Sequence, residues 1–314
     1  MKLATYQDGS RDGQLVVVSR DLSTAHYAAG IVNHLQQALD DWNFVSPQLQ
    51  DLYETINQGK ARHAFPFDPQ RCAAPLPRAY QWAQGNAFTG LAQPLQPEPA
   101  LQIEPSDAFW GPCEDIAVDS KSVGIDFAAS LAVITGDVPR GVDAEQALEG
   151  IRLFLLANTL TAHPHRHPSL ATAFSPVAVT LDELEAAWQN GRVHLTLQTH
   201  WNGRKVGLCD TGSDMRLHFG QLIAHLCARR PVRAGSVVGS GPVCSPGVAD
   251  AKGRLQWPKG YHSIAEKRAI EALQDGQAST GFMQFDDTVR IDMKDLQGQS
   301  LLGAIESCLV PTQR

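Results

Sequence analysis

The chain is organised around the segment Gly124-Ile-Asp-Phe-Ala-Ala-Ser-Leu-Ala-Val-Ile134. Small residues alternate at Ala128 and Ser130, and the segment closes in an apolar run from Leu131 to Ile134. Apolar β-formers that follow a glycine turn in this way are typical of a buried strand. We therefore expect residues 124–134 to form a buried strand that leaves a turn.

The composition is that of a folded protein with a substantial core. Of the 314 residues, 43% are hydrophobic and 19% are charged, which suits one large domain or two smaller ones. The formal net charge of −7 argues against a nucleic-acid partner, because neutralising phosphates needs clustered Lys and Arg. No apolar run approaches the roughly 20 residues of a membrane span, and Met1-Lys-Leu-Ala-Thr-Tyr6 leads into a polar turn. We predict a cytoplasmic location and no membrane partner.

The order of expected elements divides the chain at about residue 75. The hydrophobic pattern of residues 1–75 predicts a small accessory subdomain. We expect in it a strand at 15–19, a helix at 28–42 and a second helix after Pro47. A proline-rich linker follows, and residues 76–314 form the main domain. There we expect a loop at 93–107, helices at 143–156 and 180–191, a hairpin that turns at Asn202-Gly203, a helix at 215–227 and a strand at 288–293. Many strands with few long helices predict a β-rich α+β fold.

Several motifs in the main domain resemble those of the fumarylacetoacetate hydrolase family. The signature strand of that family runs Asp-Phe-Glu-x-Glu before an apolar segment like the one here. The other matching segments are Tyr80-Gln-Trp82, Ala173-Phe-Ser-Pro-Val-Ala-Val179, Gln221-Leu-Ile-Ala-His225, Gly235-Ser-Val-Val-Gly-Ser-Gly241, Ile264-Ala-Glu-Lys-Arg268 and Asp287-Thr-Val-Arg-Ile291. The resemblance implies a β-roll with a small N-terminal subdomain, and a homodimer formed through the large domain.

The resemblance also implies a chemistry, namely cleavage of a carbon–carbon bond in a β-diketo acid. In the family, four carboxylates hold Mg²⁺ or Ca²⁺, which polarises the diketone, and a His assisted by a Glu activates water. Hard oxygen ligands suit these cations, and a Lewis acid stabilises the developing enolate. A poised imidazole accepts the proton from water.

The positions that match this machinery have mostly lost it. The resemblance places the four metal ligands at Gln84, Ala128, Ser130 and Thr159, and the water-activating His at Leu91. Ser169 stands near the position of a substrate-binding Lys, and Pro242 follows Gly241 where the family has a Thr. We expect these eight residues to line a pocket that holds no metal and no other cofactor. Four uncharged side chains do not offset the hydration free energy that a dipositive ion loses when it leaves water.

Other groups are candidates to replace the lost chemistry. Glu266, in Ile-Ala-Glu, is the one retained part of the water-activating pair, and Tyr261 and His262 precede it as a possible donor or base. The stretch His163-Pro-His-Arg-His-Pro168 carries three His at two-residue spacing. They form either a transition-metal site or an exposed proline-rich loop, and we favour the loop. His165 is the fourth catalytic candidate.

Two functions of different kinds remain open. In the first, the chain is a repurposed enzyme that acts without metal on a small β-dicarbonyl or keto-acid-type metabolite. Acid–base chemistry would then drive a cyclisation, condensation, tautomerisation or decarboxylation. In the second, it is an inactive pseudoenzyme that serves as a ligand-binding or scaffolding subunit. The retained Gly-Ser-Gly loop and Glu266 favour the first, since both border the pocket in the family.

Overall fold

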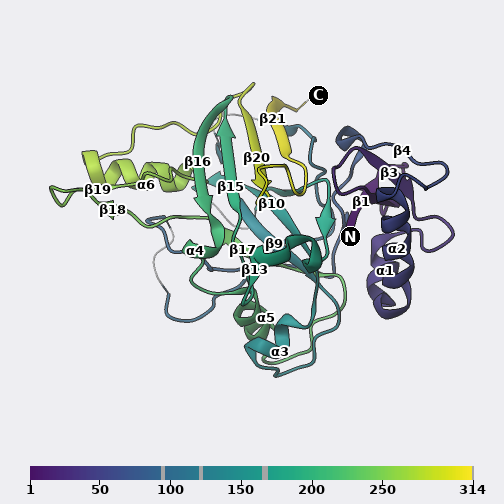
Figure 1. The fold of residues 1–314 in the computed structure, drawn as a ribbon. Coiled ribbons are helices and arrows are strands. Elements are labelled where there is room, and N and C mark those ends of the chain that lie inside the picture. The colour runs from purple at the N-terminus through teal and green to yellow at the C-terminus, as the bar shows by residue number, and fades with distance from the viewer. Residues whose placement is uncertain (93–95, 120–122, 165–168, 313–314) are drawn as a thin grey trace.

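A computed structural model describes residues 1–92, 96–119, 123–164 and 169–312. Two sheets carry the fold, and the helices lie at its edges (Figure 1). This confirms the predicted β-rich α+β class. No helix within the described ranges is long and apolar enough to cross a membrane.

The N-terminal segment forms one end of a large sheet, and two helices pack against its strands (Figure 1). Its elements are β1 (Lys2–Tyr6), β2 (Gln14–Val18), β3 (Thr24–Tyr27), α1 (Leu35–Asp40), α2 (Trp42–Asn57), β4 (Phe65–Pro66) and the 3₁₀ helix η1 (Pro69–Arg71). Helix α2 begins before Pro47 and not after it as predicted. It buries Val45, Leu49, Tyr53 and Ile56, whose helical spacing places them on one face. This packing outweighs the local effect of the proline.

The large sheet has twelve strands and runs through both parts of the chain. Its order is β4-β3-β2-β1-β12-β10-β9-β17-β5-β6, while β8 and β11 also pair with β10. Strand β1 joins β12 antiparallel, with Lys2 opposite Val179. Its strands from the main part of the chain are β5 (Gln81–Gln84), β6 (Gln102–Glu104), β8 (Gly124–Asp126), β9 (Ala129–Thr135), β10 (Ile151–His163), β11 (Ala171–Phe174), β12 (Ala178–Val179) and β17 (Ser236–Pro242).

A second sheet of five strands has the order β16-β15-β20-β21-β7. Its members are β7 (Ile116–Val118), β15 (Thr196–Trp201), β16 (Arg204–Asp210), β20 (Thr288–Lys294) and β21 (Ile305–Pro311). The predicted hairpin at Asn202-Gly203 is therefore confirmed.

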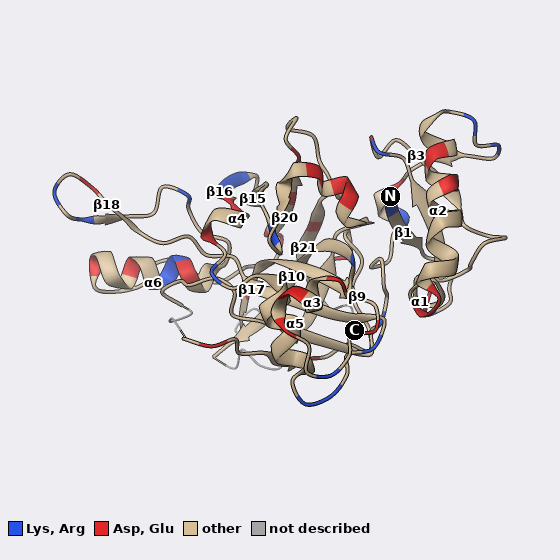
Figure 2. Cartoon of the chain, turned by 60° about the horizontal axis from the view of Figure 1, so that its bottom comes forward, with Lys and Arg blue, Asp and Glu red and all other residues tan. Residues whose placement is uncertain are grey.

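The remaining elements are short helices and two small hairpins. They are α3 (Ala144–Leu148), the 3₁₀ helix η2 (Leu181–Ala187), β13 (Trp188–Gln189), β14 (Arg192–Val193), α4 (Thr211–Asp214), α5 (Phe219–Cys227), β18 (Val248–Ala249), β19 (Leu255–Gln256) and α6 (Ile264–Asp275). Helix α6 and the β18–β19 hairpin extend from one side of the body (Figure 1). Lys and Arg are spread over several loops, β16 and α6, and both α2 and α6 carry acidic residues (Figure 2).

Two predictions for the centre of the sheet need correction. The helix expected over 143–156 ends at Leu148, and residues from Ile151 onward form the long central strand β10. An apolar run buried on both faces carries no periodicity that separates strand from helix. Residues 124–134 are strands as predicted, but they divide into β8 and β9 around Phe127 and Ala128.

Candidate functional site

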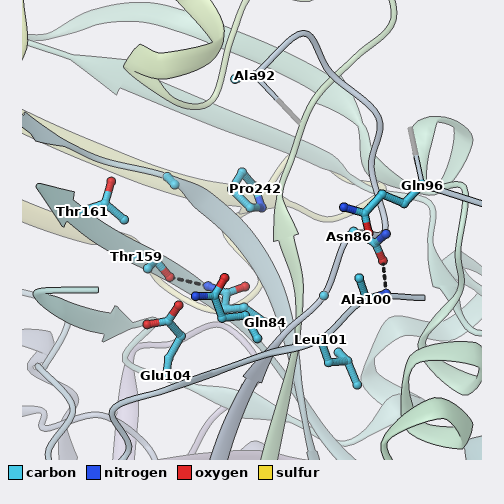
Figure 3. Close-up of a pocket in the computed structure, with 13 residues that line it drawn as sticks. Gln84, Asn86, Ala92, Gln96, Ala100, Leu101, Glu104, Thr159, Thr161 and Pro242 are labelled. Carbon is cyan, nitrogen blue, oxygen red and sulfur yellow. Dashed lines mark hydrogen bonds between the residues drawn. The ribbon is translucent and has the colours of Figure 1, made fainter. Parts of the chain in front are cut away.

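A cavity of about 330 Å³ opens between β5, β6 and β10 (Figure 3). Its described lining residues are six polar, uncharged residues, six apolar residues or glycine, and one charged residue, Glu104. Sequence analysis had singled out Gln84, Ala128, Thr159 and Pro242, and the fold brings all four to this cavity. The other described lining residues are Gly85, Asn86, Ala92, Gln96, Ala100, Leu101, Gln102 and Thr161.

Gln84 lies on β5 and contacts Thr159 on β10, although these two strands are not neighbours in the sheet. Strand β5 pairs parallel with β17, which places Gln84 beside Gly239. A Cβ atom at Gly239 would stand 2.8 Å from Gln84 Oε1 and 2.4 Å from Trp82 Cη2, so the glycine makes room for both side chains. Gln84 Nε2 donates a hydrogen bond of 2.5 Å to Thr159 Oγ1 (Figure 3). This bond joins two of the positions that the family resemblance assigns to metal ligands.

Ser130 lies behind the lining and is fully buried. It pairs with Ala157 of β10 and with Pro242 of β17. The Ser130 Oγ atom has no hydrogen-bond partner among the described residues, and neither has Gln84 Oε1. These two atoms are therefore unsatisfied polar groups beside the cavity.

Glu104 is a cavity residue that sequence reasoning missed. It is 4% exposed, and its Oε2 atom accepts a hydrogen bond of 2.7 Å from the backbone N–H of Ser169. In Figure 3 its carboxyl group lies next to Gln84 and Thr159. The segment 93–107 reads as a loop rich in Pro, Gln and Glu, and the three-residue strand β6 is too short to give a period-two signal. Ser169 therefore contributes to the cavity through its backbone N–H, which binds the Glu104 carboxyl group.

Glu266 holds the loop at the cavity mouth. Its side chain is 1% exposed, and its two oxygens accept hydrogen bonds of 2.9 Å from the backbone N–H groups of Leu91 and Ala92. Leu91 itself is 41% exposed, and Ala92 lines the cavity. Gly241 has a φ of 75° and packs against the backbone of Gly85, so it shapes the same edge.

Tyr261 and His262 make their side-chain contacts away from the lining residues. His262 Nδ1 lies 2.7 Å from Thr199 Oγ1 of β15, and complete burial lowers the pKa of His262 to about 4. Burial also raises the pKa of Tyr261, and the ammonium of Lys267 lies 5.9 Å from the centre of the Tyr261 ring. His262 is thus a neutral imidazole within the core at physiological pH.

Asp126 caps α6 and also faces His163. Its two carboxylate oxygens accept the backbone N–H groups of Ile264 and Ala265 at 2.7 and 2.9 Å. His163 Nε2 lies 3.5 Å from Asp126 Oδ2, and the His163 ring stacks on Phe282 with the ring centres 4.4 Å apart. His165 and His167 lie outside the described residues, so the predicted alternatives for that loop stay open.

Two family models match the chain. Fumarylacetoacetase N-terminal domain 2 matches residues 1–78, and the fumarylacetoacetate (FAA) hydrolase C-terminal model matches residues 78–310. The chain belongs to the fumarylacetoacetate hydrolase family. A search of curated proteins found no match.

Solved structures of this family share the fold over nearly the whole chain. A maleylpyruvate hydrolase from Sphingobium sp. SYK-6, in complex with manganese (II) ion and pyruvate, superimposes with a TM-score of 0.70 at 15% identity, and 100% of each chain is covered. The fumarylacetoacetate hydrolase of Exiguobacterium antarcticum gives 0.65 at 15% identity, covering 99% of this chain and 100% of the other. A 2-hydroxyhepta-2,4-diene-1,7-dioate isomerase from Mycobacterium marinum gives 0.61 at 15% identity, with 100% of both chains covered.

The residues at this cavity do not fit the divalent cation that the family implies. Gln84 and Thr159 offer only uncharged oxygens and are joined by the Gln84 Nε2–Thr159 Oγ1 hydrogen bond, Ala128 offers no ligand atom, and Ser130 offers a hydroxyl. Glu104 supplies a single carboxyl group, and no three His, Cys, Asp or Glu side chains gather as a metal site within the described part of the chain. Mg²⁺ and Ca²⁺ are held in proteins by several hard, mostly anionic oxygen ligands, and this donor set lacks them.

Proposed function

We propose that this protein is a metabolic enzyme that transfers protons on a small β-dicarbonyl or keto-acid-type compound without the family's divalent cation. The observation that carries the proposal is the cavity that brings together Gln84, Thr159 and Glu104, with amide and hydroxyl groups beside one carboxyl group. Tautomerisation is the reaction that this set supports best, because it needs no second substrate and no Lewis acid.

Glu104 is the proposed base. Its carboxylate takes the proton from the carbon next to a substrate carbonyl, the C–H electron pair forms a carbon–carbon double bond, and the carbonyl oxygen gains the negative charge. The amide N–H groups of Gln84 and the hydroxyls of Thr159 and Thr161 are the donors near that oxygen. Return of the proton from Glu104 to another atom of the substrate completes the tautomerisation.

Glu266 enters the proposal as a positioning residue. Both of its oxygens already bind the Leu91 and Ala92 backbone, so it fixes the mouth of the cavity. His165, Tyr261 and His262 remain as the further acid–base candidates that the sequence suggests. The homodimer and the cytoplasmic location also stay predictions.

A ligand-binding or scaffolding role is the second candidate. It is favoured by the engagement of Glu266, the retained member of the family's water-activating pair, in two backbone hydrogen bonds. In this case the cavity binds the same class of compound but leaves it unchanged.

The deciding experiment measures turnover under chelation. The protein is incubated with EDTA and a panel of β-diketones and β-keto acids, and product is followed by NMR. We expect turnover that survives EDTA and falls by about 10²–10⁴-fold in Glu104→Gln, the range that a general base contributes. Glu98→Gln, an exposed carboxyl beside the same loop, is the matched control and should retain activity.

Three results would count against this assignment. Full activity in Glu104→Gln would remove Glu104 from the mechanism, and activity that needs added Mg²⁺ or Mn²⁺ would contradict metal independence. Binding of panel members without turnover would establish the second candidate. Glu266→Gln and His165→Ala are assayed in parallel, and we expect Glu266→Gln to raise KM more than it lowers kcat.

A further inference from the structure

We propose that Asn86 is a positioning residue, which holds one wall of the cavity in place and so sets the affinity for the ligand. The wall is the segment 96–102, and Asn86 lines the same cavity across from it (Figure 3). This inference rests on the proposed function and deepens it, because it assigns a role in ligand affinity to a residue outside the proposed proton transfer. The lining residues that the wall contributes are Gln96, Ala100, Leu101 and Gln102.

The backbone on either side of Asn86 is bound to β17. The N–H group of Gly85 donates to the Gly239 carbonyl and that of Ala87 to the Ser240 carbonyl, each at 2.8 Å. These bonds direct the backbone of this segment toward β17, on the side of β5 that faces away from β6. Asn86 therefore has a fixed backbone, and its side chain is the part that reaches the wall.

The side chain of Asn86 makes two hydrogen bonds to the backbone of the wall. Its Oδ1 atom accepts the N–H group of Ala100 at 2.8 Å, and its Nδ2 atom donates to the carbonyl of Glu98 at 3.2 Å (Figure 3). One amide thus satisfies a backbone donor and a backbone acceptor that lie two residues apart. Within the described ranges, residues 96–101 form no other hydrogen bond with the rest of the chain.

The register of β5 and β6 explains why a side chain serves the wall at this point. The two strands pair antiparallel, and Gln84 lies opposite Gln102. Continued by two residues, this register would place Asn86 opposite Ala100, but β5 ends at Gln84 and β6 begins at Gln102. The Asn86 amide therefore takes the place of a backbone partner where the ladder has ended. The position of the wall depends on this one side chain.

The proposed base, Glu104, is held by contacts that do not involve Asn86. Glu104 lies in β6 opposite Trp82, and its Oε2 atom accepts the N–H group of Ser169. Loss of the Asn86 amide should therefore loosen the wall and leave the carboxyl group of Glu104 in place. We expect KM to rise without an equal fall in kcat, because the change affects binding of the ligand and not the reaction step.

Two variants of the full chain separate the two hydrogen bonds. Asn86→Leu has a side chain of similar size and removes both bonds. Asn86→Asp keeps the oxygen that accepts the Ala100 N–H and removes the donor to the Glu98 carbonyl. Asn43→Leu, at an exposed position of α2 outside the cavity, is the matched control.

Hydrogen–deuterium exchange measures the state of the wall without any ligand. The exchange rate of the Ala100 amide is followed by NMR at constant pH and temperature. We expect it to rise about three- to tenfold in Asn86→Leu, the fold-change that one net hydrogen bond supports, and to stay near the wild-type rate in Asn86→Asp and Asn43→Leu. An unchanged rate in Asn86→Leu would overturn the inference. An equal rise throughout β9 and β10 would overturn it too, since it would show a general loss of stability.

Steady-state kinetics test the consequence for affinity, with the compound of the β-diketone and β-keto acid panel that the wild type turns over. We expect Asn86→Leu to raise KM about three- to tenfold while kcat changes by less than about twofold. An unchanged KM, or a fall in kcat as large as the rise in KM, would contradict a positioning role.

The inference and the proposed function can fail separately. If panel compounds bind but none is turned over, the enzyme is refuted, and an equal rise in Kd in Asn86→Leu supports the inference in place of KM. Turnover that depends on Glu104, with an unchanged KM in Asn86→Leu, refutes the inference alone. If no panel compound binds, the proposed function fails and the exchange rate of the Ala100 amide decides the inference.

Discussion

Single side chains decide what this family fold can do here. Gln84 and Thr159 hydrogen-bond to each other, and the family resemblance assigns these two positions and Ala128 to metal ligands. Glu104 brings one carboxyl group to the same cavity from β6. On the residue correspondence that the family resemblance implies, we therefore expect the cavity to be polar and weakly acidic where the family binds a cation.

The first prediction at this scale concerns metal addition. A site with a Kd of 10 μM would stabilise the native state by about 2.7 kcal/mol at 1 mM Mn²⁺, which raises the Tm by roughly 5 °C for a chain of this size. We expect no such rise for the chelator-treated protein in a thermal melt. The Sphingobium maleylpyruvate hydrolase, whose structure holds manganese, is the positive control. A rise of that size would show that the residues do accept a cation.

The second prediction concerns the pH dependence of stability. His262 has its pKa lowered to about 4 in the folded chain, against about 6.5 when unfolded. The unfolded state therefore binds the proton first, and the contribution of neutral His262, intact above pH 6.5, is lost as the pH falls toward 4. The free energy of unfolding therefore falls by about 3 kcal/mol between pH 6.5 and pH 4.

Urea unfolding of the wild type and His262→Gln between pH 4 and 7 measures this effect. The amide keeps a partner for Thr199 but does not titrate. We expect the wild type to lose its advantage over the variant as the pH falls, and a constant difference across the range would contradict the assignment.

At the scale of elements, a residue of the large sheet caps the N-terminus of α6. Asp126, at the end of β8, accepts two of the free N–H groups of the first helical turn, and Ser263 caps the Glu266 N–H. Because Glu266 in that turn holds the cavity mouth, the contact links the helix start to the site.

Replacing Asp126 by Ala should lower the free energy of unfolding by about 3 kcal/mol, since two buried N–H groups lose a charged acceptor. Asp275→Ala, at the exposed C-terminal end of the same helix, should change it by less than about 0.5 kcal/mol. Chemical denaturation measures both. Equal effects of the two substitutions would show that the carboxylate of Asp126 is not what stabilises the helix.

Elements with a short-range signal were predictable from sequence only in part. The helix expected over 28–42 is confined to Leu35–Asp40, and the one expected over 180–191 is a 3₁₀ helix that ends at Ala187. The hairpin at Asn202-Gly203 and the cap at Asp143 have short-range signals, and the structure confirms both. The strand from Ile151 has none, because it is buried on both faces. Four lining residues of the cavity were found through family motifs, whereas Glu104 comes from a three-residue strand whose pairing with β5 is set by tertiary structure.

At the scale of the whole molecule, the N-terminal segment and the main part of the chain share one sheet and one core. Leu3, Val17 and Leu49 pack in the same buried cluster as Trp82 and Leu155. The buried Lys2 ammonium donates to the backbone carbonyl of Leu301, which ties β1 to the C-terminal region, and burial lowers the pKa of Lys2 to about 8.

We therefore predict one cooperative unfolding transition for the full chain. Tryptophan fluorescence and far-ultraviolet circular dichroism, followed in the same urea series, should give coincident curves. Leu3 lies in the core that the two parts share, so Leu3→Ala serves as a control. It should lower the free energy of unfolding by about 2–5 kcal/mol and shift both midpoints together. Two separate transitions would mean that the N-terminal segment unfolds on its own.

Gly239 has a consequence for the natural history of this site. With no side chain there, Trp82 and Gln84 can lie flat across the sheet, and a methyl group would collide with both. Gly239 is not among the described lining residues, so a requirement for the cavity would constrain a position outside its lining. Natural variants of this chain that still use the cavity should keep glycine at position 239. A variant with another residue there should have lost the function of the cavity.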